Sequence, residues 1–321
     1  MSTCWNKMGN GGVSCGFQHS YSHFPHFYIS HSRKTCTKST WLKMARNGTE
    51  ADTVYAVVYG SVITLGLPLN ALSLWILLRH HGRKSPNAVF MINLVISDLL
   101  LIISLPMKVY FYATHKWPLG NMACVWLTML FRNNIRSSAV FITFISIDRL
   151  LAVVYPLKSR QLRSSSNATK GAVLVWLIVV MVNIPESLNL LNYLKNNTSN
   201  VSTCFDDKKD FFPPIAYFQL VLLFTLLFIN IVSTVLVSLT LNRHLNISTR
   251  INNRVNVMLI FAMNLLMFSI FFLPVSLTVF FDNKRALNCL ASVNCCLDPL
   301  LYYFSFDGFW KKKEDTDRST E

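Results

Sequence analysis

Hydrophobic positions cluster into long blocks along the chain, and short charged or polar segments separate them. A lipid hydrocarbon core about 30 Å thick requires about 20 apolar residues in a helix. Windows of at least this length with few or no charged residues occur at 53–78, 85–107, 123–155, 171–185 with an extension to 191, 211–242, 255–281 and 286–306. Because lipid cannot satisfy an irregular backbone, each window predicts a membrane-spanning helix. The expected fold class is an all-α membrane protein with a seven-transmembrane-helix bundle.

The composition supports a membrane protein. Hydrophobic residues make up 52% of the 321 residues and charged residues 14%, whereas soluble domains carry about 25% charged residues. This excludes a disordered chain and disfavours a water-soluble enzyme. The sequence contains no glycine-rich phosphate loop, nucleophile elbow or metal-ligand spacing, so we expect no enzymatic activity.

The charge distribution predicts the orientation. The net charge of +15 would suggest a nucleic-acid partner in a soluble protein, but here the basic residues fall in alternate loops, so no such partner is expected. These residues are Arg79, Arg83, Lys84, Lys158, Arg160, Arg163, Lys170, Arg243, Arg250, Arg254 and Lys311 to Lys313. The positive-inside rule places these loops in the cytoplasm and the N-terminus outside, as in a multi-pass plasma-membrane protein.

Three regions follow from this topology: an extracellular segment at 1–52, the bundle at 53–306, and a cytoplasmic tail at 307–321 that begins with a short amphipathic helix near Phe309. Cys4, Cys15 and Cys36 allow a metal site in the first region, although their spacing matches no known site. Initiation at Met44 is an alternative. Glycosylation sequons on the outer side begin at Asn47, Asn196, Asn197 and Asn200.

Polar residues inside apolar spans are costly, at about 2.5–3.5 kcal/mol for a charge at the helix centre, and therefore suggest function. Here they form an ordered set with several aromatic residues and prolines: Asn70, Asn93, Asp98, Asp148-Arg149-Leu150, Trp176, Phe268-x-x-Phe271-Phe272-x-Pro274 and Asp298-Pro299-Leu-Leu-Tyr302. From about residue 50 to residue 313 the chain resembles the rhodopsin-like (class A) G-protein-coupled receptors.

Further segments resemble the purinergic-related branch of that family. They are Ser104 to Lys108, Lys116-Trp117-Pro118 and Asn294 to Phe304. The segment from Gly66 to Trp75 and the ending from Tyr302 to Phe309 are most similar to the non-Edg lysophosphatidic acid receptors and the related lysolipid and aromatic-acid receptors. The branch also includes nucleotide receptors, so a purinergic nucleotide receptor is an alternative.

The resemblance implies a disulfide between Cys124 and Cys204, which would hold an outer loop over the pocket. It also implies a buried sodium site, and sodium is the only candidate cofactor. The matching residues are Asp98, Asn134, Ser138, Asn294 and Asp298. Oxygen ligands suit a hard cation, but a polar network that holds water without an ion is the alternative.

The resemblance also implies an activation mechanism with a heterotrimeric G protein as the partner. Asp148 pairs with Arg149 in the inactive state, and Arg149 is released to the G protein when helix six moves. Leu157 is expected to fill an apolar pocket on the G protein, or else to pack within its loop. The switch residues are Phe268, Phe272, Pro274, Asp298, Pro299 and Tyr302.

Several positions depart from the family pattern. Leu150 replaces an aromatic residue, Phe272 replaces Trp, Asn230 replaces Pro and Ser238 replaces Tyr. The segment 282–285 between spans six and seven is unusually short. Asn230, Ser238 and this segment motivate the alternative of a decoy receptor that binds its ligand without signalling.

The candidate ligand site is cationic. Arg132 and Arg136 are four residues apart and share a face of span three, while Lys108 and Tyr112 lie near the outer end of span two. Because Arg favours bidentate contact with phosphate or carboxylate, we expect an anionic small molecule or lysolipid, with an acyl tail among Phe131, Phe218 and Phe281. Alternatively, Glu186 neutralises Arg132 and Lys108 extends to the membrane interface. A transporter is the rival class, but the sequence shows none of the repeats it predicts.

Overall fold

The computed structural model describes residues 38–81, 85–157, 159, 161, 163–196, 204–205, 213–243, 251–277 and 284–302. The side chains of 38–49, 80–81, 213, 243 and 251–256 are outside this description. The chain divides into two units, Met1–Val54 and Tyr55–Glu321. In the first unit the described residues are helical, and the second unit contains the bundle.

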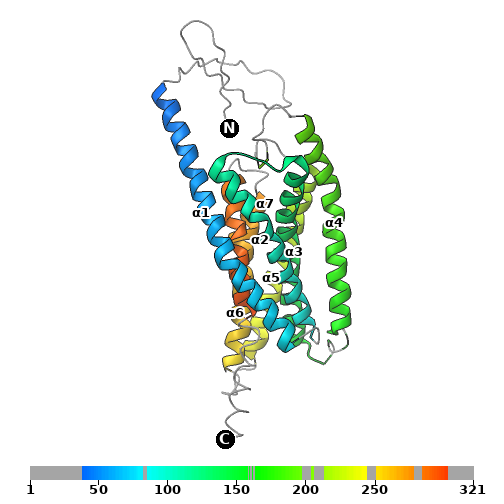
Figure 1. Ribbon diagram of the computed structural model, residues 1–321. Coiled ribbons are helices and arrows are strands. Elements are labelled where there is room, and N and C mark those ends of the chain that lie inside the picture. The colour runs from blue at the N-terminus through cyan, green and yellow to red at the C-terminus, as the bar shows by residue number, and fades with distance from the viewer. Residues whose placement is uncertain are drawn as a thin grey trace, which may run out of the picture. The chain divides into compact units, whose positions relative to one another are not determined.

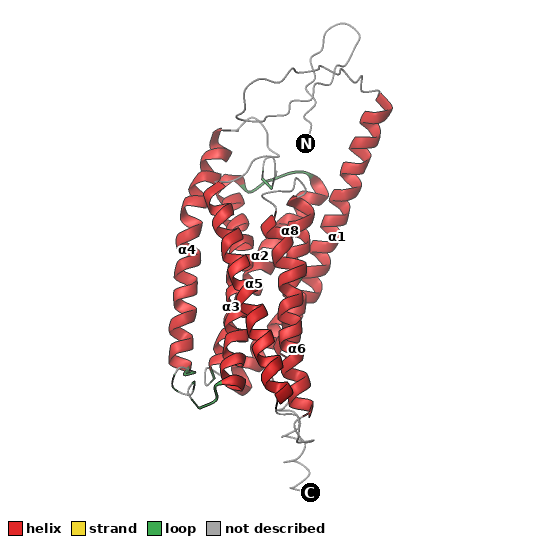
Figure 2. Ribbon diagram, turned by 180° about the vertical axis from the view of Figure 1, so that it is seen from behind, coloured by secondary structure: helices red, strands yellow, loops and turns green. Residues whose placement is uncertain are grey.

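Helices make up the described part of the chain, with no strand among them (Figure 2). They are α1 (Lys38–Ile76), η1 (Leu77–His81), α2 (Pro86–Thr114), α3 (Gly120–Val154), α4 (Ser165–Asn196), α5 (Pro213–Arg243), α6 (Ile251–Met267), η3 (Phe268–Phe272), α7 (Leu273–Ser276) and α8 (Lys284–Ser292). Six described segments are long and apolar enough to cross a membrane. The predicted all-α membrane fold is therefore confirmed.

The seventh span differs from the expectation of one helix over 286–306. It begins at Lys284, is interrupted by a turn at Val293, and continues as helix to residue 302. At the turn, Cys296 N–H donates to the carbonyl of Val293, three residues back, at 3.0 Å. Ser292 Oγ also donates to the carbonyl of Cys289, and such side-chain bonds compete with the helical ladder. The tail at 307–321 and its expected amphipathic helix lie outside the described residues.

Span six was expected to kink at Pro274. Just before this residue it contains a π-helical turn, which is wider than a turn of α-helix. Pro274 lacks an N–H, and its ring clashes with the carbonyl four residues back. The helix accommodates this with the π-helical segment η3, in which Leu273 N–H donates to the carbonyl of Phe268, five residues back. Phe268 and Phe272 are both buried here, with ring centroids 5.4 Å apart.

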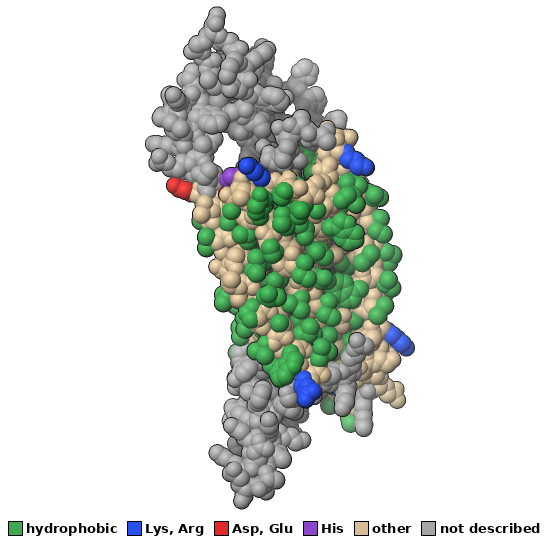
Figure 3. Space-filling view, in the orientation of Figure 1, with side chains coloured by type: hydrophobic (Ala, Val, Ile, Leu, Met, Phe, Trp, Pro, Cys, Tyr) green, Lys and Arg blue, Asp and Glu red, His purple; other side chains and the backbone are tan. Residues whose placement is uncertain are grey.

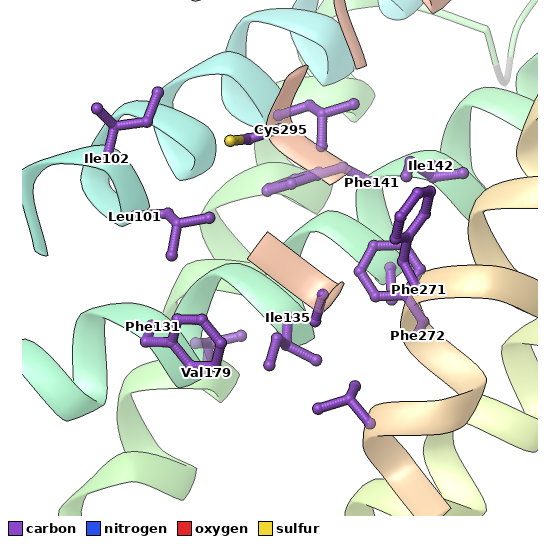
Figure 4. Packing of buried hydrophobic residues seen from close by; sticks show 14 of the residues in the cluster. Leu101, Ile102, Phe131, Ile135, Phe141, Ile142, Val179, Phe271, Phe272 and Cys295 are labelled. Carbon is purple, nitrogen blue, oxygen red and sulfur yellow. The ribbon is translucent and has the colours of Figure 1, made fainter. Parts of the chain in front are cut away.

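Helix α3 is central in the bundle of Figure 1, and it contacts α2, α4, α5, α6 and η3. The core around it consists of apolar side chains from every span, and Phe141 and Ile142 of α3 are fully buried (Figure 4). In Figure 4, Phe271 and Phe272 of η3 are seen in the same part of the core as Ile142. Hydrophobic side chains also cover the middle of the face in Figure 3, and the described Lys and Arg side chains lie near its two ends. This surface matches a lipid-facing belt.

Close packing joins α1 to the seventh span. Asn70 Nδ2 donates to the carbonyl of Cys295 at 2.8 Å. A Cβ at Gly66 would lie 3.2 Å from Ile102 Cδ1 and 3.4 Å from Cys295 Sγ, whereas a Cβ at Gly60 would meet nothing within 4 Å. Gly66 thus permits the approach of three spans.

Replacing Gly66 with Val tests this packing. Overpacking should lower the free energy of unfolding by about 1–3 kcal/mol. Gly60→Val, on the same helix, is the matched control and should change stability much less. Thermal unfolding of the detergent-solubilised protein measures both, and equal melting temperatures for the two variants would contradict the packing argument.

Candidate functional site

The candidate ligand site centres on one carboxylate that contacts two guanidinium groups. Arg136 Nη2 lies 2.7 Å from Glu186 Oε2, and Arg132 Nη1 pairs with the other oxygen, Oε1. Glu186 on α4 and Arg136 on α3 are 1% and 2% exposed, while Arg132 is 28% exposed. The two arginines share a face of α3, as their spacing predicts. Glu186 does pair with Arg132, as the alternative stated, but the same carboxylate also binds Arg136.

Arg136 has additional acceptors. Its Nη1 donates to Asn183 Oδ1 at 2.5 Å, and its Nη2 contacts Gln219 Oε1 at 3.4 Å. Asn183 in turn donates to Asn133. Arg136 therefore connects α3, α4 and α5 through polar contacts. Within this group, two guanidinium groups share one carboxylate.

Lys108 is buried among aromatic rings. Its Nζ lies 3.4 Å from the ring centroid of Phe131, 5.3 Å from that of Tyr59 and 5.5 Å from that of Phe205. An ammonium group within about 6 Å of a ring face is attracted by the ring quadrupole. The side chain is 5% exposed, so the alternative that Lys108 extends to the membrane interface is wrong. Tyr112 is also buried and stacks on Tyr59 at 5.8 Å.

A disulfide fixes the position of Phe205. Cys124 of α3 is bonded to Cys204, with their Cα atoms 5.8 Å apart. The next residue, Phe205, has a positive φ of 63°, which is strained for an aromatic side chain. Its ring packs edge-to-face with Phe111 and Trp117 at 5.5 and 5.4 Å. The implied disulfide is present, and it places an aromatic ring beside Lys108.

The residues of the implied sodium site form two hydrogen-bonded groups. In the first, Asn134 Nδ2 donates to Asp98 Oδ1 at 2.9 Å and to Ser138 Oγ at 3.1 Å. In the second, Asn294 Nδ2 donates to Asp298 Oδ2 at 2.7 Å.

Several oxygens of this site have no hydrogen-bond donor within the described part of the chain. They are Asp98 Oδ2, Asp298 Oδ1 and Asn294 Oδ1. Buried carboxylates are expensive unless a proton or a cation compensates them. The set is entirely oxygen, which fits Na⁺. A bound cation would supply charge neutralisation between the two carboxylates. Tyr302, expected in the switch, is buried nearby, and its hydroxyl too has no partner among the described residues.

At the C-terminal end of α3, the partner of Asp148 differs from the expected one. Both oxygens of Asp148 accept bonds from Arg163, at 2.9 Å from Nε and 3.1 Å from Nη2. The prediction that Asp148 pairs with Arg149 is therefore wrong in this conformation, because a bidentate guanidinium from the following loop occupies the carboxylate. Arg149 Nε is buried and has no hydrogen-bond partner within the described residues. Leu157, in the same loop, is 89% exposed, so it does not pack within the loop.

A polar cluster that sequence reasoning missed surrounds Asn230. Asn230 Nδ2 donates to Thr143 Oγ1 at 2.8 Å, and its Oδ1 accepts from Ser146 Oγ at 2.6 Å. Asn264 Nδ2 of α6 donates to Ser146 Oγ at 2.5 Å. Asn230, Ser146 and Asn264 are 0% exposed. The residue that replaces the family's Pro thus connects α5 to α3, and Ser146 extends the cluster to α6.

Other contributors were also missed, namely Asn183, Gln219 and Arg163. Asn183 lies three residues before Glu186, so helical spacing could have placed it on the same face. Nothing in the sequence singles out Arg163 from the other basic loop residues. Of the sequons, Asn196 is exposed at the end of α4. Asn47 falls in α1 without a described side chain, and Asn197 and Asn200 lie outside the described residues.

The comparisons identify the family. The sequence matches the 7 transmembrane receptor (rhodopsin family) over residues 69–302, more than half of the chain. The chain belongs to this family. The receptor is 31% identical to lysophosphatidic acid receptor 6 of Gallus gallus over 280 residues, which cover 79% of this chain and 91% of the relative.

Two further relatives support the expected branch. Lysophosphatidic acid receptor 4 of Homo sapiens is 30% identical over 305 residues, which cover 87% of the receptor and 80% of the relative. Purinoceptor 8 of Gallus gallus is 31% identical over 284 residues, covering 80% and 77% of the two chains. The resemblance to the purinergic-related branch is therefore confirmed, and the receptor is a multi-pass membrane protein.

Asn230→Ala tests the cluster between α3, α5 and α6. The variant loses two buried inter-helix hydrogen bonds and should lower the free energy of unfolding by about 1–3 kcal/mol. Thr225→Ala is the control on the same helix, because the exposed Thr225 hydroxyl donates only to the carbonyl of Val221 one turn away. The melting temperature of the purified receptor is the measurement. An Asn230→Ala variant as stable as Thr225→Ala would exclude a structural role for the cluster.

Proposed function

We propose that this receptor binds an extracellular lysolipid with an anionic headgroup, of the lysophosphatidic acid type, and activates a heterotrimeric G protein. It acts at the plasma membrane with its N-terminus outside. The main support is the cationic group in the outer half of the bundle. In the described part of the chain, Arg132, Arg136 and Lys108 are accompanied there by a single buried carboxylate, Glu186.

The cationic side chains favour a phosphate headgroup. Arg132, Arg136 and Lys108 outnumber the one carboxylate among the described residues of this group, and a phosphate monoester carries nearly two negative charges. Guanidinium groups bind phosphate through paired N–H donors. The aromatic rings of Phe131 and Phe205, beside Lys108, offer apolar surface for the start of an acyl chain. Of the other expected tail contacts, Phe218 is 45% exposed, and Phe281 lies outside the described residues.

The similarity to relatives supports the same ligand class, because several of them are named lysophosphatidic acid receptors. The similarity to purinoceptor 8 keeps a nucleotide as the second candidate. Both ligands present phosphate to the arginines, but only the lysolipid requires an apolar tail site. Comparing the two as agonists separates these candidates.

Coupling to the G protein involves the cytoplasmic end of α3. The buried Arg149 and the exposed Leu157 are the residues we assign to G-protein contact. Ligand binding shifts an existing equilibrium between conformations of span six. The switch comprises Phe268, Phe272 and Pro274 at the π-helical turn, with Asp298, Pro299 and Tyr302 on span seven.

Arg132→Gln tests the ligand site. Losing one charge-assisted contact to the headgroup should raise the agonist concentration needed for half-maximal response by at least about tenfold. The measurement is nucleotide exchange on G proteins in membranes that contain the receptor, with lysophosphatidic acid as agonist and ADP or UTP as comparison.

Lys195→Gln is the control, because it removes an exposed charge from the outer end of α4. Its response should equal that of the unmodified receptor. An unchanged potency in Arg132→Gln would reject the anion site. Ligand binding without nucleotide exchange would identify a decoy receptor instead.

A further inference from the structure

Glu186 occupies the place where an anionic headgroup would bind. Its carboxylate contacts Arg132 through Oε1 and Arg136 through Oε2. A carboxylate and a phosphate use the same acceptor chemistry toward guanidinium. Any anion that approaches these arginines therefore meets a negative group already bound there.

The two arginines are not equivalent. Arg136 is 2% exposed and has Asn183, Glu186 and Gln219 as acceptors. Arg132 is 28% exposed and lies one turn, about 6 Å along the axis, nearer the outer start of α3. A ligand that enters from outside reaches Arg132 first. Because the buried Arg136 cannot be left without a counter-charge, Glu186 stays with Arg136 when it releases Arg132.

The exchange of partners depends on the charge of the ligand. A headgroup with one negative charge replaces at Arg132 only what Glu186 already supplies, while the displaced carboxylate still repels it. A phosphate monoester brings a second negative charge, so both its attraction to the arginines and its repulsion by the displaced carboxylate are larger.

We propose that Glu186 is a resident counter-anion that the ligand headgroup displaces from Arg132, so that its negative charge lowers the affinity of the receptor for anionic headgroups, most strongly for doubly charged ones. This inference rests on the proposed function, namely that the ligand is an anion bound at Arg132. It assigns Glu186 a role in setting the affinity for anionic ligands in addition to its role in holding α3 to α4.

Glu186→Gln removes the negative charge and keeps the size of the side chain. Three oleoyl lipids serve as probes: lysophosphatidic acid with two charges, its phosphate methyl ester with one, and monooleoylglycerol with none. Competition binding to the receptor in lipid nanodiscs measures each affinity. Glu186→Gln should increase the affinity for lysophosphatidic acid on the order of tenfold, increase that for the methyl ester less, and leave the neutral lipid unchanged.

A second variant covers the case in which Glu186→Gln does not fold. Glu186→Asp keeps the charge, but the shorter side chain cannot span both guanidinium groups. It should release Arg132 and increase the affinity for lysophosphatidic acid by a smaller factor. Asn183→Ala is the matched control, because it loosens Arg136 without removing a charge and should not increase the affinity for either anion.

The outcomes separate this inference from the proposed function. If Arg132→Gln weakens lysophosphatidic acid binding while both Glu186 variants weaken it or leave it unchanged, Glu186 is purely structural and the inference is overturned. The same holds if all three lipids shift equally. If Arg132→Gln leaves binding unchanged, the anion site itself fails. The double variant with Arg132→Gln and Glu186→Gln should show a smaller increase in affinity for lysophosphatidic acid than Glu186→Gln alone. It lacks the guanidinium for which the carboxylate and the headgroup compete.

Discussion

The polar side chains of this receptor must find their partners inside the bundle, because the surrounding lipid offers none. Helix α3 has polar side chains on two opposite sides, and each side finds partners on a neighbouring helix. Residues two apart in a helix point about 200° apart. Arg132 and Arg136 therefore face α4, while Asn134 and Ser138 face Asp98 on α2. Further along the helix, Ser146 meets Asn230 on α5 and Asn264 on α6. A single central helix thus contacts the charge cluster around Glu186, the carboxyl of Asp98 and the polar cluster around Asn230.

The spans and the ordered polar positions could be read from the sequence, since they follow from the length of apolar windows and the cost of burying charge. Partner choice could not. Arg149 is adjacent to Asp148 in sequence, yet Arg163 reaches that carboxylate from a loop whose path no periodicity encodes. Lys108 near a helix end normally extends to the interface, but three aromatic rings from different segments hold it inside. These outcomes depend on tertiary geometry.

One departure from the family pattern, Asn230, is buried and hydrogen-bonded. Asn230 stands where the family has Pro, and its side chain both donates and accepts between helices α5 and α3. A proline at that position could make neither bond. A proline would interrupt the backbone hydrogen bonds of span five, whereas Asn230 instead adds side-chain hydrogen bonds to α3. Its partner Ser146 also bonds Asn264 on the span expected to move.

The π-helical turn at η3 also affects which side of span six faces the core. One extra residue in a turn advances the helix face by about 100° for everything beyond it. Phe261 and Phe268, seven residues apart, lie on one buried stripe below the turn. Beyond Phe268 the buried set continues at Phe271, Phe272 and Val275, three or four residues apart as before the turn. The apolar stripe therefore passes through the π-helical turn with unbroken spacing along the sequence. The two α-helical parts of the span, Ile251–Met267 and Leu273–Ser276, are joined at the ring pair of Phe268 and Phe272.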